Sequence, residues 1–187
     1  MGSLQNHLLI AMPNLDDPYF QRSVIYLCEH DEDGAMGLIV NQPISQLSVS
    51  QLLDKLEYPN ETDPQTTLNK QVFNGGPVEQ ERGFVLHSPQ LPWNSSQKIS
   101  EQIMLTTSKD ILEVIGTTSA PDDFIITLGY ASWTKGQLEQ ELADNTWLTI
   151  QADADVIFKT PVEQRWEKAT KKLGFDVWQL TSQSGHC

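Results

Sequence analysis

Short apolar runs with the period of strands alternate along this chain with stretches that carry the period of helices. The strand-like runs cover residues 7–12, 23–30, 35–41, 71–73, 83–87, 101–107, 123–131 and 146–151. The helix-like stretches cover 48–56, 107–116, 134–142 and 160–174. Because strands and helices are interleaved without a repeat or a break in composition, the pattern predicts a single α/β domain over residues 1–187, with a mixed sheet.

Polar segments separate these elements. The stretches 57–70 and 88–100 contain prolines and lack periodicity, so we expect both to be surface loops. The turn sequence at 31–34 lies between two strand-like runs and predicts a hairpin. Residues 175–187, after the last helix, are expected to form a C-terminal tail.

Several helices begin with a capping signature. The Ser/Thr-x-x-Gln spacing of a capping box occurs at Ser48–Gln51 and at Thr134–Gln137. At the last helix, Thr160 is the predicted N-cap, followed by Pro161 at the first position and Glu163 at the third. These signatures predict that helices start at all three places.

The composition is that of a folded domain in the cytoplasm. Hydrophobic residues make up 39% of the 187 residues, which is enough for a core. Apolar runs such as Leu8–Met12 are far shorter than the roughly 20 residues that a membrane-spanning helix needs. The first residues lack a cationic segment, so no signal peptide is expected. With only Cys28 and Cys187 present, no disulfide framework is expected either.

The formal net charge of −13 argues against binding to a phosphate backbone. A basic stripe does occur on the last helix, where Arg165, Lys168 and Lys172 are spaced i, i+3 and i+7. No helix-turn-helix or RNA-binding signature precedes this stripe. We therefore interpret it as a solvated helix face, and direct DNA binding is a disfavoured alternative.

The sequence Phe-Asn-Gly-Gly-Pro-Val at 73–78 is the most conspicuous loop motif. It fails the dinucleotide-binding fingerprint, because no third glycine follows until Gly83, and it lacks the Gly-Lys-Ser/Thr end of a P-loop. A sharp turn in left-handed backbone is the favoured interpretation. A nest of backbone amides at Asn74, Gly75 and Gly76 that attracts an anion remains open.

The stretch 128–142 joins a strand to a helix, and ligands usually bind at such strand ends in α/β proteins. Tyr130 and Trp133 bring two rings to this corner, and Gln137 offers an amide. Ser132 lacks the second glycine of Gly-x-Ser-x-Gly, so the nucleophile elbow is not met. The corner is interpreted either as an aromatic part of the core, which is favoured, or as the wall of a pocket.

Metal or cofactor binding is not predicted. Cys28 and His30 are two residues apart on one strand, so their side chains share a face, and His87 is a conceivable third ligand. However, neither Cys-x-x-Cys nor His-x-x-x-His occurs in the sequence. The two residues are therefore interpreted as a buried thiol and a histidine at a strand end.

Taken in order, residues 7–43, 72–87, 105–113, 128–142 and 160–174 resemble the bacterial YqgE/AlgH family. The resemblance implies a compact cytosolic α/β domain whose mixed sheet bends into a partly closed, barrel-like core with flanking helices. It supplies no catalytic or ligand-binding residues. The family carries a loose label of transcriptional regulator, which fits poorly with a chain of net charge −13.

The favoured hypothesis is a non-enzymatic binding or regulatory domain that acts through a protein or small-molecule partner. Its candidate ligand-binding residues are Asn74, Gly75, Gly76, Pro77, Arg82, His87, Gly129, Tyr130, Trp133 and Gln137. The alternative is an enzyme with a site near His87 and Tyr130. A cleft that holds His87 within hydrogen-bond reach of a carboxylate and a hydroxyl would support that alternative.

Overall fold

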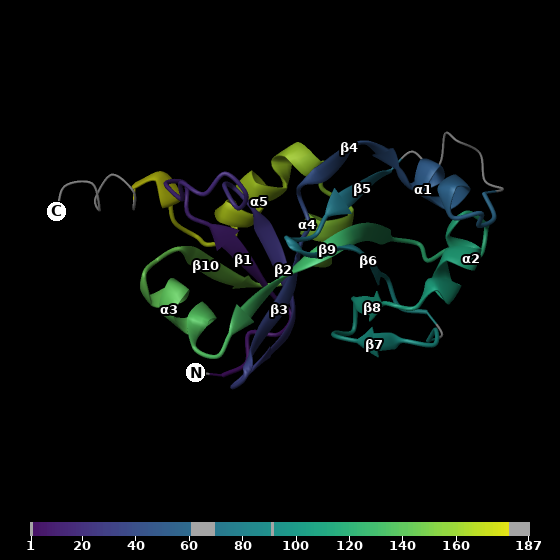
Figure 1. The fold of residues 1–187 in the computed structure, drawn as a ribbon. Helices are drawn as coiled ribbons and strands as arrows, with labels where there is room; N and C mark the ends of the chain where they lie inside the picture. Colours follow the sequence, from purple (N-terminus) through teal and green to yellow (C-terminus); the bar gives the residue numbers. More distant parts are fainter. Residues whose placement is uncertain (1, 61–69, 91, 180–187) are drawn as a thin grey trace. The chain divides into compact units, whose positions relative to one another are not determined.

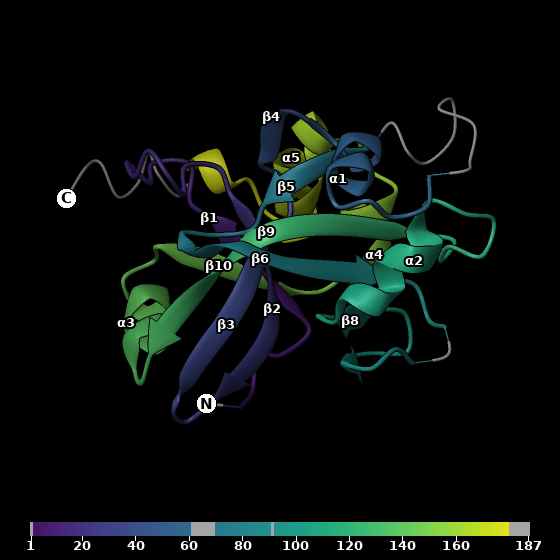
Figure 2. The same ribbon diagram turned by 45° about the vertical axis from the view of Figure 1, so that its right-hand side comes forward.

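The computed structural model describes residues 2–60, 70–90 and 92–179, and the chain divides into two compact units. The first unit combines Met1–Gln42 with Ala131–Cys187, and the second is Pro43–Tyr130. Figures 1 and 2 show the ribbon in two views. Strands and helices alternate along the chain, so the mixed α/β class predicted from the sequence is confirmed.

The first unit contains an antiparallel sheet with the strand order β10-β1-β2-β3-β9. Its strands are β1 (His7–Ala11), β2 (Val24–Asp31), β3 (Gly34–Ile39), β10 (Trp147–Gln151) and the end of β9 (Phe124–Thr134). Its helices are α3 (Gln137–Ala143), α4 (Ala154–Phe158), the 3₁₀ turn η3 (Val162–Gln164) and α5 (Arg165–Lys171). The pairing of β2 with β3 confirms the predicted hairpin.

The second unit contains the other sheet, in which β5 pairs with β4 on one side and with β9 on the other. Beyond β9 the order continues through β6, β8 and β7. The strands are β4 (Pro43–Ser48), β5 (Gln71–Asn74), β6 (Val78–His87), β7 (Ser96–Lys98) and β8 (Met104–Thr106). The helices are α1 (Val49–Lys55), the 3₁₀ turn η2 (Lys109–Ile111) and α2 (Leu112–Ile115). The β5–β9 pair is parallel, which makes this sheet mixed.

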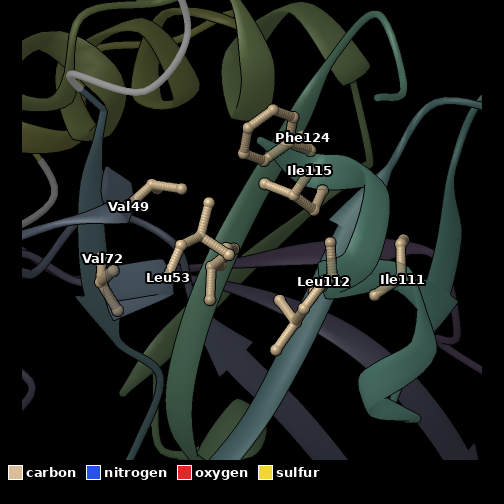
Figure 3. Packing of buried hydrophobic residues seen from close by; sticks show 9 residues of the cluster. Val49, Leu53, Val72, Ile111, Leu112, Ile115 and Phe124 are labelled. Carbon is tan, nitrogen blue, oxygen red and sulfur yellow. The ribbon is translucent and has the colours of Figure 1, made fainter. Parts of the chain in front are cut away.

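Helix α1 begins as predicted from its capping box. The Ser48 hydroxyl accepts a hydrogen bond from the Gln51 amide at 3.1 Å, and the Gln51 side chain accepts one from the Ser48 amide at 2.8 Å. With its first turn fixed in this way, α1 places Val49 and Leu53 in a hydrophobic cluster with α2 and with Phe124 of β9. Figure 3 shows these side chains converging between the two helices and the strands.

The core of the first unit lies on its antiparallel sheet. The side chains from Val24 to Cys28 are all 0% exposed, because β2 is covered on both faces. Trp133 and Trp147 belong to a cluster with Leu138 of α3. A buried strand of this kind keeps its side chains away from solvent and from reagents.

Cys28 illustrates that protection, and we expect iodoacetamide at pH 8 to leave it unmodified in the native protein. The thiol is buried, and burial raises its pKa, so it has neither the access nor the thiolate that alkylation needs. Peptide mass spectrometry of the labelled protein measures this, with a sample alkylated in urea as the positive control. Rapid modification of Cys28 without denaturant would contradict the expectation.

Two predictions near β9 and the loops need correction. The loop predicted over 88–100 contains a short strand, β7, whose polar residues pair with β8. The Thr134–Gln137 box does not cap α3, because the N-cap residue is Gly136, in left-handed backbone with φ of 79°. The Gln137 side chain still accepts a hydrogen bond from the Thr134 amide at 3.0 Å, which is one half of the expected reciprocal pair.

The predicted start of the last helix is also wrong. Thr160 does not act as its N-cap; the Thr160 hydroxyl donates to the carbonyl of Asp155 at 2.9 Å. Asp155 belongs to α4, a helix that the sequence analysis missed. The chain then forms η3 before α5 begins at Arg165. The local signature predicts a helix start at Thr160, whereas in the structure η3 and then α5 follow that residue.

The basic stripe on that helix is not a solvated face throughout. Arg165 is 6% exposed, and its guanidinium donates to the carbonyls of Thr160 and Val40. Burial lowers the pKa of Arg165 to about 10, so the side chain stays charged at neutral pH. Lys168 and Lys172 remain exposed. Arg165 therefore serves the packing of the first unit rather than a surface for nucleic acid.

Among the described residues, none of the helices has both the length and the apolar composition required to cross a membrane. The predicted loop 57–70 lies mostly outside the described residues, and so do Cys187 and most of the predicted C-terminal tail. Within that tail, Val177 is 3% exposed, and Trp178 packs edge-on against Trp166 with ring centroids 5.9 Å apart.

Candidate functional site

The glycine-rich turn at 74–76 packs directly against β9 in the second unit. The Gly75 amide donates to the carbonyl of Leu128 at 2.8 Å. A Cβ atom on Gly75 would lie 2.4 Å from the carbonyl oxygen of Gly129, and one on Gly129 would lie 2.4 Å from the carbonyl oxygen of Gly76. Such distances are impossible for real side chains, so glycines are required where these two backbones meet.

This packing leaves little for a ligand to bind at the turn. The Gly75 amide is already engaged by Leu128, and the Gly76 amide donates to the side-chain oxygen of Asn74 at 3.2 Å. Both glycines are buried, and Pro77 is exposed but has no amide hydrogen. The geometry therefore favours the interpretation as a sharp turn over the interpretation as an anion-binding nest.

Arg82 and Tyr130 lie on the surface beside this turn. A hydrogen bond to the Glu79 carboxylate raises the pKa of Tyr130. The Arg82 guanidinium lies 3.5 Å from the same carboxylate and 5.2 Å from the centroid of the Phe84 ring. Since Arg82 and Glu79 are both about half exposed, the pair is weak and leaves Arg82 available for other partners.

His87 lies further along β6, where it pairs with Phe124 and is 0% exposed. Its Nδ1 is 2.8 Å from the carbonyl of Ser88, which can only accept, so Nδ1 carries the hydrogen. Its Nε2 is then the acceptor for the Thr106 hydroxyl, at 2.7 Å. Thr106 in turn lies 2.7 Å from the Ser96 hydroxyl. These bonds form a directed chain of hydroxyls that ends on the imidazole.

The hydrogen bonds of His87 match only part of what would support the enzyme hypothesis. His87 reaches a hydroxyl, but the partner on its other side is a backbone carbonyl rather than a carboxylate. Burial lowers the pKa of His87, which keeps the ring neutral at pH 7. Because both His87 and Thr106 are at most 1% exposed, the arrangement is suited to holding β6 and β8 together.

Trp133 and Gln137 belong to the first unit, where both have partners of their own. The Trp133 indole donates to Oε1 of Glu141 at 3.0 Å, and the Trp147 indole donates to the same oxygen at 2.9 Å. The Gln137 amide donates to the other oxygen of Glu141 at 2.9 Å. Glu141 thus joins two buried rings to α3, a role that the sequence analysis did not anticipate.

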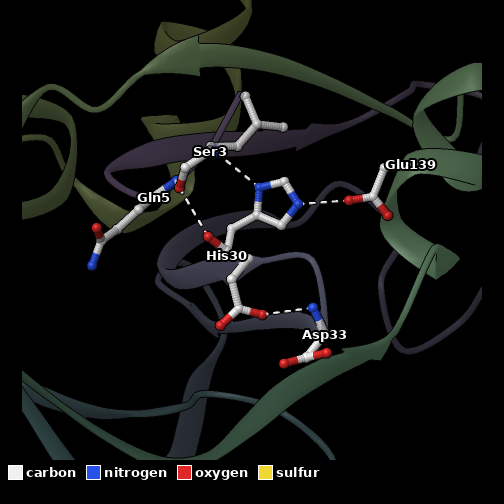
Figure 4. A network of polar contacts seen from close by, with 7 residues as sticks. Ser3, Gln5, His30, Asp33 and Glu139 are labelled. Atoms are coloured by element: carbon white, nitrogen blue, oxygen red, sulfur yellow. Dashed lines mark hydrogen bonds and ion pairs between the residues drawn. The ribbon is translucent and has the colours of Figure 1, made fainter. Parts of the chain in front are cut away.

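A second polar network in the first unit surrounds His30 (Figure 4). The Leu4 amide donates to Nδ1 of His30 at 2.8 Å, so Nε2 carries the hydrogen and donates to Glu139 at 2.6 Å. This hydrogen bond lowers the pKa of Glu139. The Ser3 hydroxyl donates to the His30 carbonyl at 2.9 Å. The network therefore fastens the N-terminal segment and α3 to the end of β2.

The second unit also contains a pocket of about 440 Å³, which the sequence analysis did not predict. Its apolar lining includes residues of α1 and its C-cap, of β6, of α2 and of β9: Leu52, Leu56, Phe84, Val85, Leu112, Ile126 and Leu128. Val85, Leu112 and Ile126 belong to the hydrophobic cluster of this unit, so the pocket is an opening onto the core. Leu56 at the mouth is 44% exposed.

A bulge in β6 forms one wall of the pocket. The strand pairs with β9 at Val78–Tyr130 and again from Gly83–Leu128, so the residues from Glu79 to Arg82 form a bulge that is not paired in register with β9. Arg82 and Glu81 line the mouth from this bulge, and Lys109 lines it from η2. Of the residues predicted for a site, Arg82 is the one that lines this pocket.

Sequence reasoning missed the pocket because its lining residues carry no distinctive motif. Leu52 and Leu112 have the periodicity of ordinary core helices, and Leu128 that of a strand. A weak signal in the sequence was the polar run at 79–82, which precedes the apolar half of β6. Among the described residues, no group of three or more His, Cys, Asp or Glu side chains is placed to hold a metal ion.

The fold and the pocket define a mixed α/β protein whose second unit opens its hydrophobic core to solvent beneath a partly basic rim. A family model described as AlgH-like matches residues 8–178, so the chain belongs to the AlgH-like family. This confirms the family resemblance seen in the sequence.

Relatives match the chain over its whole length. It is 60% identical to a UPF0301 protein of Shewanella woodyi and 58% identical to one of Idiomarina loihiensis, with 100% of each chain covered. The solution structure of the AlgH protein from Pseudomonas aeruginosa is 43% identical with a TM-score of 0.77, over 99% of this chain and 96% of that one. A crystal structure from Corynebacterium diphtheriae, at 19% identity and a TM-score of 0.69 over 92% and 87%, shares the fold.

Proposed function

We propose that this chain is a non-enzymatic binding domain whose second unit holds a small, mainly apolar molecule in the pocket between α1, β6 and α2. The observation that carries the proposal is the open hydrophobic cluster described above. Its volume of about 440 Å³ falls within the range of roughly 300–1,000 Å³ that is usual for small-molecule sites.

The physical argument is the free energy of exposed apolar surface. Leu52 and Leu128 pack against the cluster but remain only partly buried, and Leu56 is 44% exposed. Removing apolar surface from water is favourable by about 25 cal/mol per Å². A ligand that covers these three leucines would therefore gain free energy that folding leaves unused.

Binding is favoured over catalysis because the best candidate for a general base is inaccessible. The one histidine of the second unit, His87, is 0% exposed and is separated from the pocket by Thr106, which is 1% exposed. A general base has to reach the proton that it removes, directly or through one water molecule. Any regulatory effect would then depend on pocket occupancy rather than on contact with DNA, as the net charge of −13 also suggests.

Gly83 provides a way to close the pocket without disturbing the fold. It lies on the same face of β6 as Val85, which lines the pocket. A Cβ atom on Gly83 would meet only Leu128 Cδ2, at 3.8 Å, an ordinary contact distance. The substitution Gly83→Leu therefore points its side chain at Leu128 and into the pocket.

We expect the neutral dye N-phenyl-1-naphthylamine to brighten on binding the parent protein, and Gly83→Leu to weaken that binding at least about tenfold. The reason is that the added side chain occupies the space that the dye needs, and a tenfold loss corresponds to about 1.4 kcal/mol. Fluorescence titration measures the binding, and circular dichroism confirms that the variant is folded.

The matched control is Gln97→Leu, which adds a leucine at an exposed position of β7 outside the pocket. This control should bind the dye like the parent. If the parent does not bind the dye, or if Gly83→Leu binds it unchanged, the proposed function is wrong.

A further inference from the structure

We infer that the ligand of this pocket is an amphipathic monoanion, an alkyl chain ending in a carboxylate, whose acidic group pairs with Lys109. This inference rests on the proposed function and adds the chemical class of the ligand. It comes from the way charge is distributed around an otherwise apolar opening.

Among the described residues, basic side chains outnumber acidic ones in the lining of the pocket. Segment 43–130 contains five lysines and arginines, Lys55, Lys70, Arg82, Lys98 and Lys109, against eleven acidic residues. Two of those five, Arg82 and Lys109, line the pocket, whereas Glu81 is the one acidic residue that does so among the nine that the structure describes. A unit with an acidic excess thus has a basic excess at this opening, which favours an anion.

Lys109 is the more available of the two cations that line the pocket. Lys98 pairs with Glu101 at 3.1 Å, and Arg82 lies 3.5 Å from Glu79. Within the described part of the chain, no carboxylate lies within the 4.0 Å of an ion pair with the exposed ammonium of Lys109.

The acidic residue next to Lys109 does not compete for it. The carboxylate of Asp110 accepts hydrogen bonds from the Ser108 hydroxyl and from the Asn94 amide at 2.8 Å. These bonds also lower the pKa of Asp110, so that its charge is held by its own donors. An incoming carboxylate would therefore meet Lys109 without displacing an internal partner.

The position of Lys109 relative to the apolar wall suits a molecule with a charged head and an alkyl tail. Lys109 and Leu112 are three residues apart in the continuous turn from η2 to α2, and both line the pocket. Residues at this spacing lie on one side of a helix. A carboxylate at Lys109 thus leaves the tail lying over Leu112 and towards Leu52.

The small number of charged donors favours a carboxylate over a phosphate. Thr106, Thr107 and Ser108 bring hydroxyls to the pocket and Gln80 brings an amide, but these groups are neutral, and Thr106 and Ser108 already bond with His87 and Asp110. A phosphate group is recognised by several donors at once, often with arginine in bidentate geometry. One lysine, with a partly engaged Arg82 nearby, matches a single negative charge.

The test is displacement of the bound dye by decanoate and by decanol, which share an alkyl chain and differ in charge. Below their aggregation concentrations and at pH 7.5, we expect decanoate to displace the dye at about three- to fivefold lower concentration than decanol, the effect of one partly exposed ion pair. Raising the salt concentration should narrow this difference.

Variants assign the effect to Lys109. We expect Lys109→Gln to remove the preference for decanoate over decanol, taken as the ratio of the two displacing concentrations on the same variant, and Lys109→Arg to retain that preference. The matched control is Lys98→Gln, which changes the charge of the same unit by the same amount outside the pocket, and which should behave like the parent.

The inference is overturned if decanol and decanoate displace the dye equally, if the preference survives in Lys109→Gln, or if decyltrimethylammonium displaces it best. The last result would point to Glu81 instead. Displacement by a protein fraction but by none of these amphiphiles would show a docking groove for a polypeptide, and would also overturn it. In all these cases dye binding that is sensitive to Gly83→Leu would leave the proposed function standing, so the two failures are distinguishable.

Discussion

Replacing Gly75 with alanine is expected to lower the free energy of unfolding by about 3 kcal/mol or more. This is the upper end of the range of losses that overpacking substitutions in a core cause. The added methyl group would lie 2.4 Å from the carbonyl oxygen of Gly129, and 3.0 Å from both Cβ and Oγ1 of Thr127. Because the closest atom belongs to the backbone, no side-chain rotation can relieve the clash. The β5–β9 pairing would have to separate.

Urea denaturation followed by far-UV circular dichroism measures this effect. The matched control is Gly83→Ala in β6, which also pairs with β9, and there the new methyl group meets only Leu128 Cδ2 at 3.8 Å. We expect the control to lie within about 0.5 kcal/mol of the parent, or slightly above it, because alanine restricts the unfolded chain more than glycine does. A Gly75→Ala variant as stable as this control would show that the turn and β9 are not packed as described.

The expectation for Gly75 also shows what the sequence could and could not reveal about the turn. The Gly-Gly pair predicts a sharp change of direction from local stereochemistry alone. Whether its amides are free for an anion depends on Leu128, a residue distant in the chain that accepts the Gly75 hydrogen. Local patterns therefore predicted the turn but could not decide between a turn and a nest.

The fold was predictable where local signals and burial agree. The run from Val24 to Cys28 reads as a strand because it is apolar throughout, and the structure buries it completely. The Ser48–Gln51 box correctly starts α1. Strand β7 was missed because Ser96, Gln97 and Lys98 are polar, and what makes them a strand is their pairing with β8.

The candidate site was harder to predict than the fold. Concavity in the second unit arises from the bulge in β6 and from leucines on three separate elements, none of which has a motif of its own. Conversely, the rings of Tyr130 and Trp133 suggested from the sequence either an aromatic part of the core or the wall of a pocket. The structure gives Trp133 a partner in Glu141 and places it in the core of the first unit.

That partnership leads to the second large expected effect. We expect Glu141→Ala to lower the free energy of unfolding by about 3 kcal/mol, because it leaves two buried indole N–H groups without an acceptor, each at a cost of about 1–3 kcal/mol. The rings concerned, Trp133 and Trp147, are 6% and 3% exposed, so water cannot easily replace the carboxylate.

Two variants separate the contribution of Glu141 from a general effect of shortening α3. Glu141→Gln keeps an oxygen that can accept from both indoles but turns a donor towards the Gln137 amide, so a smaller loss of about 1 kcal/mol is expected. Gln140→Ala changes an exposed residue of the same helix and should have an effect within about 0.5 kcal/mol.

Thermal and urea denaturation monitored by tryptophan fluorescence report on these rings directly. A loss of less than about 1 kcal/mol for Glu141→Ala would mean that water satisfies the indoles, and hence that the corner around Trp133 opens to solvent. In that case the first unit would offer a hydrated aromatic corner of the kind that the sequence suggested as a pocket wall. A large loss instead assigns Trp133, Gln137 and Glu141 to the stability of the first unit, and leaves the pocket in the second unit as the place to look for a ligand.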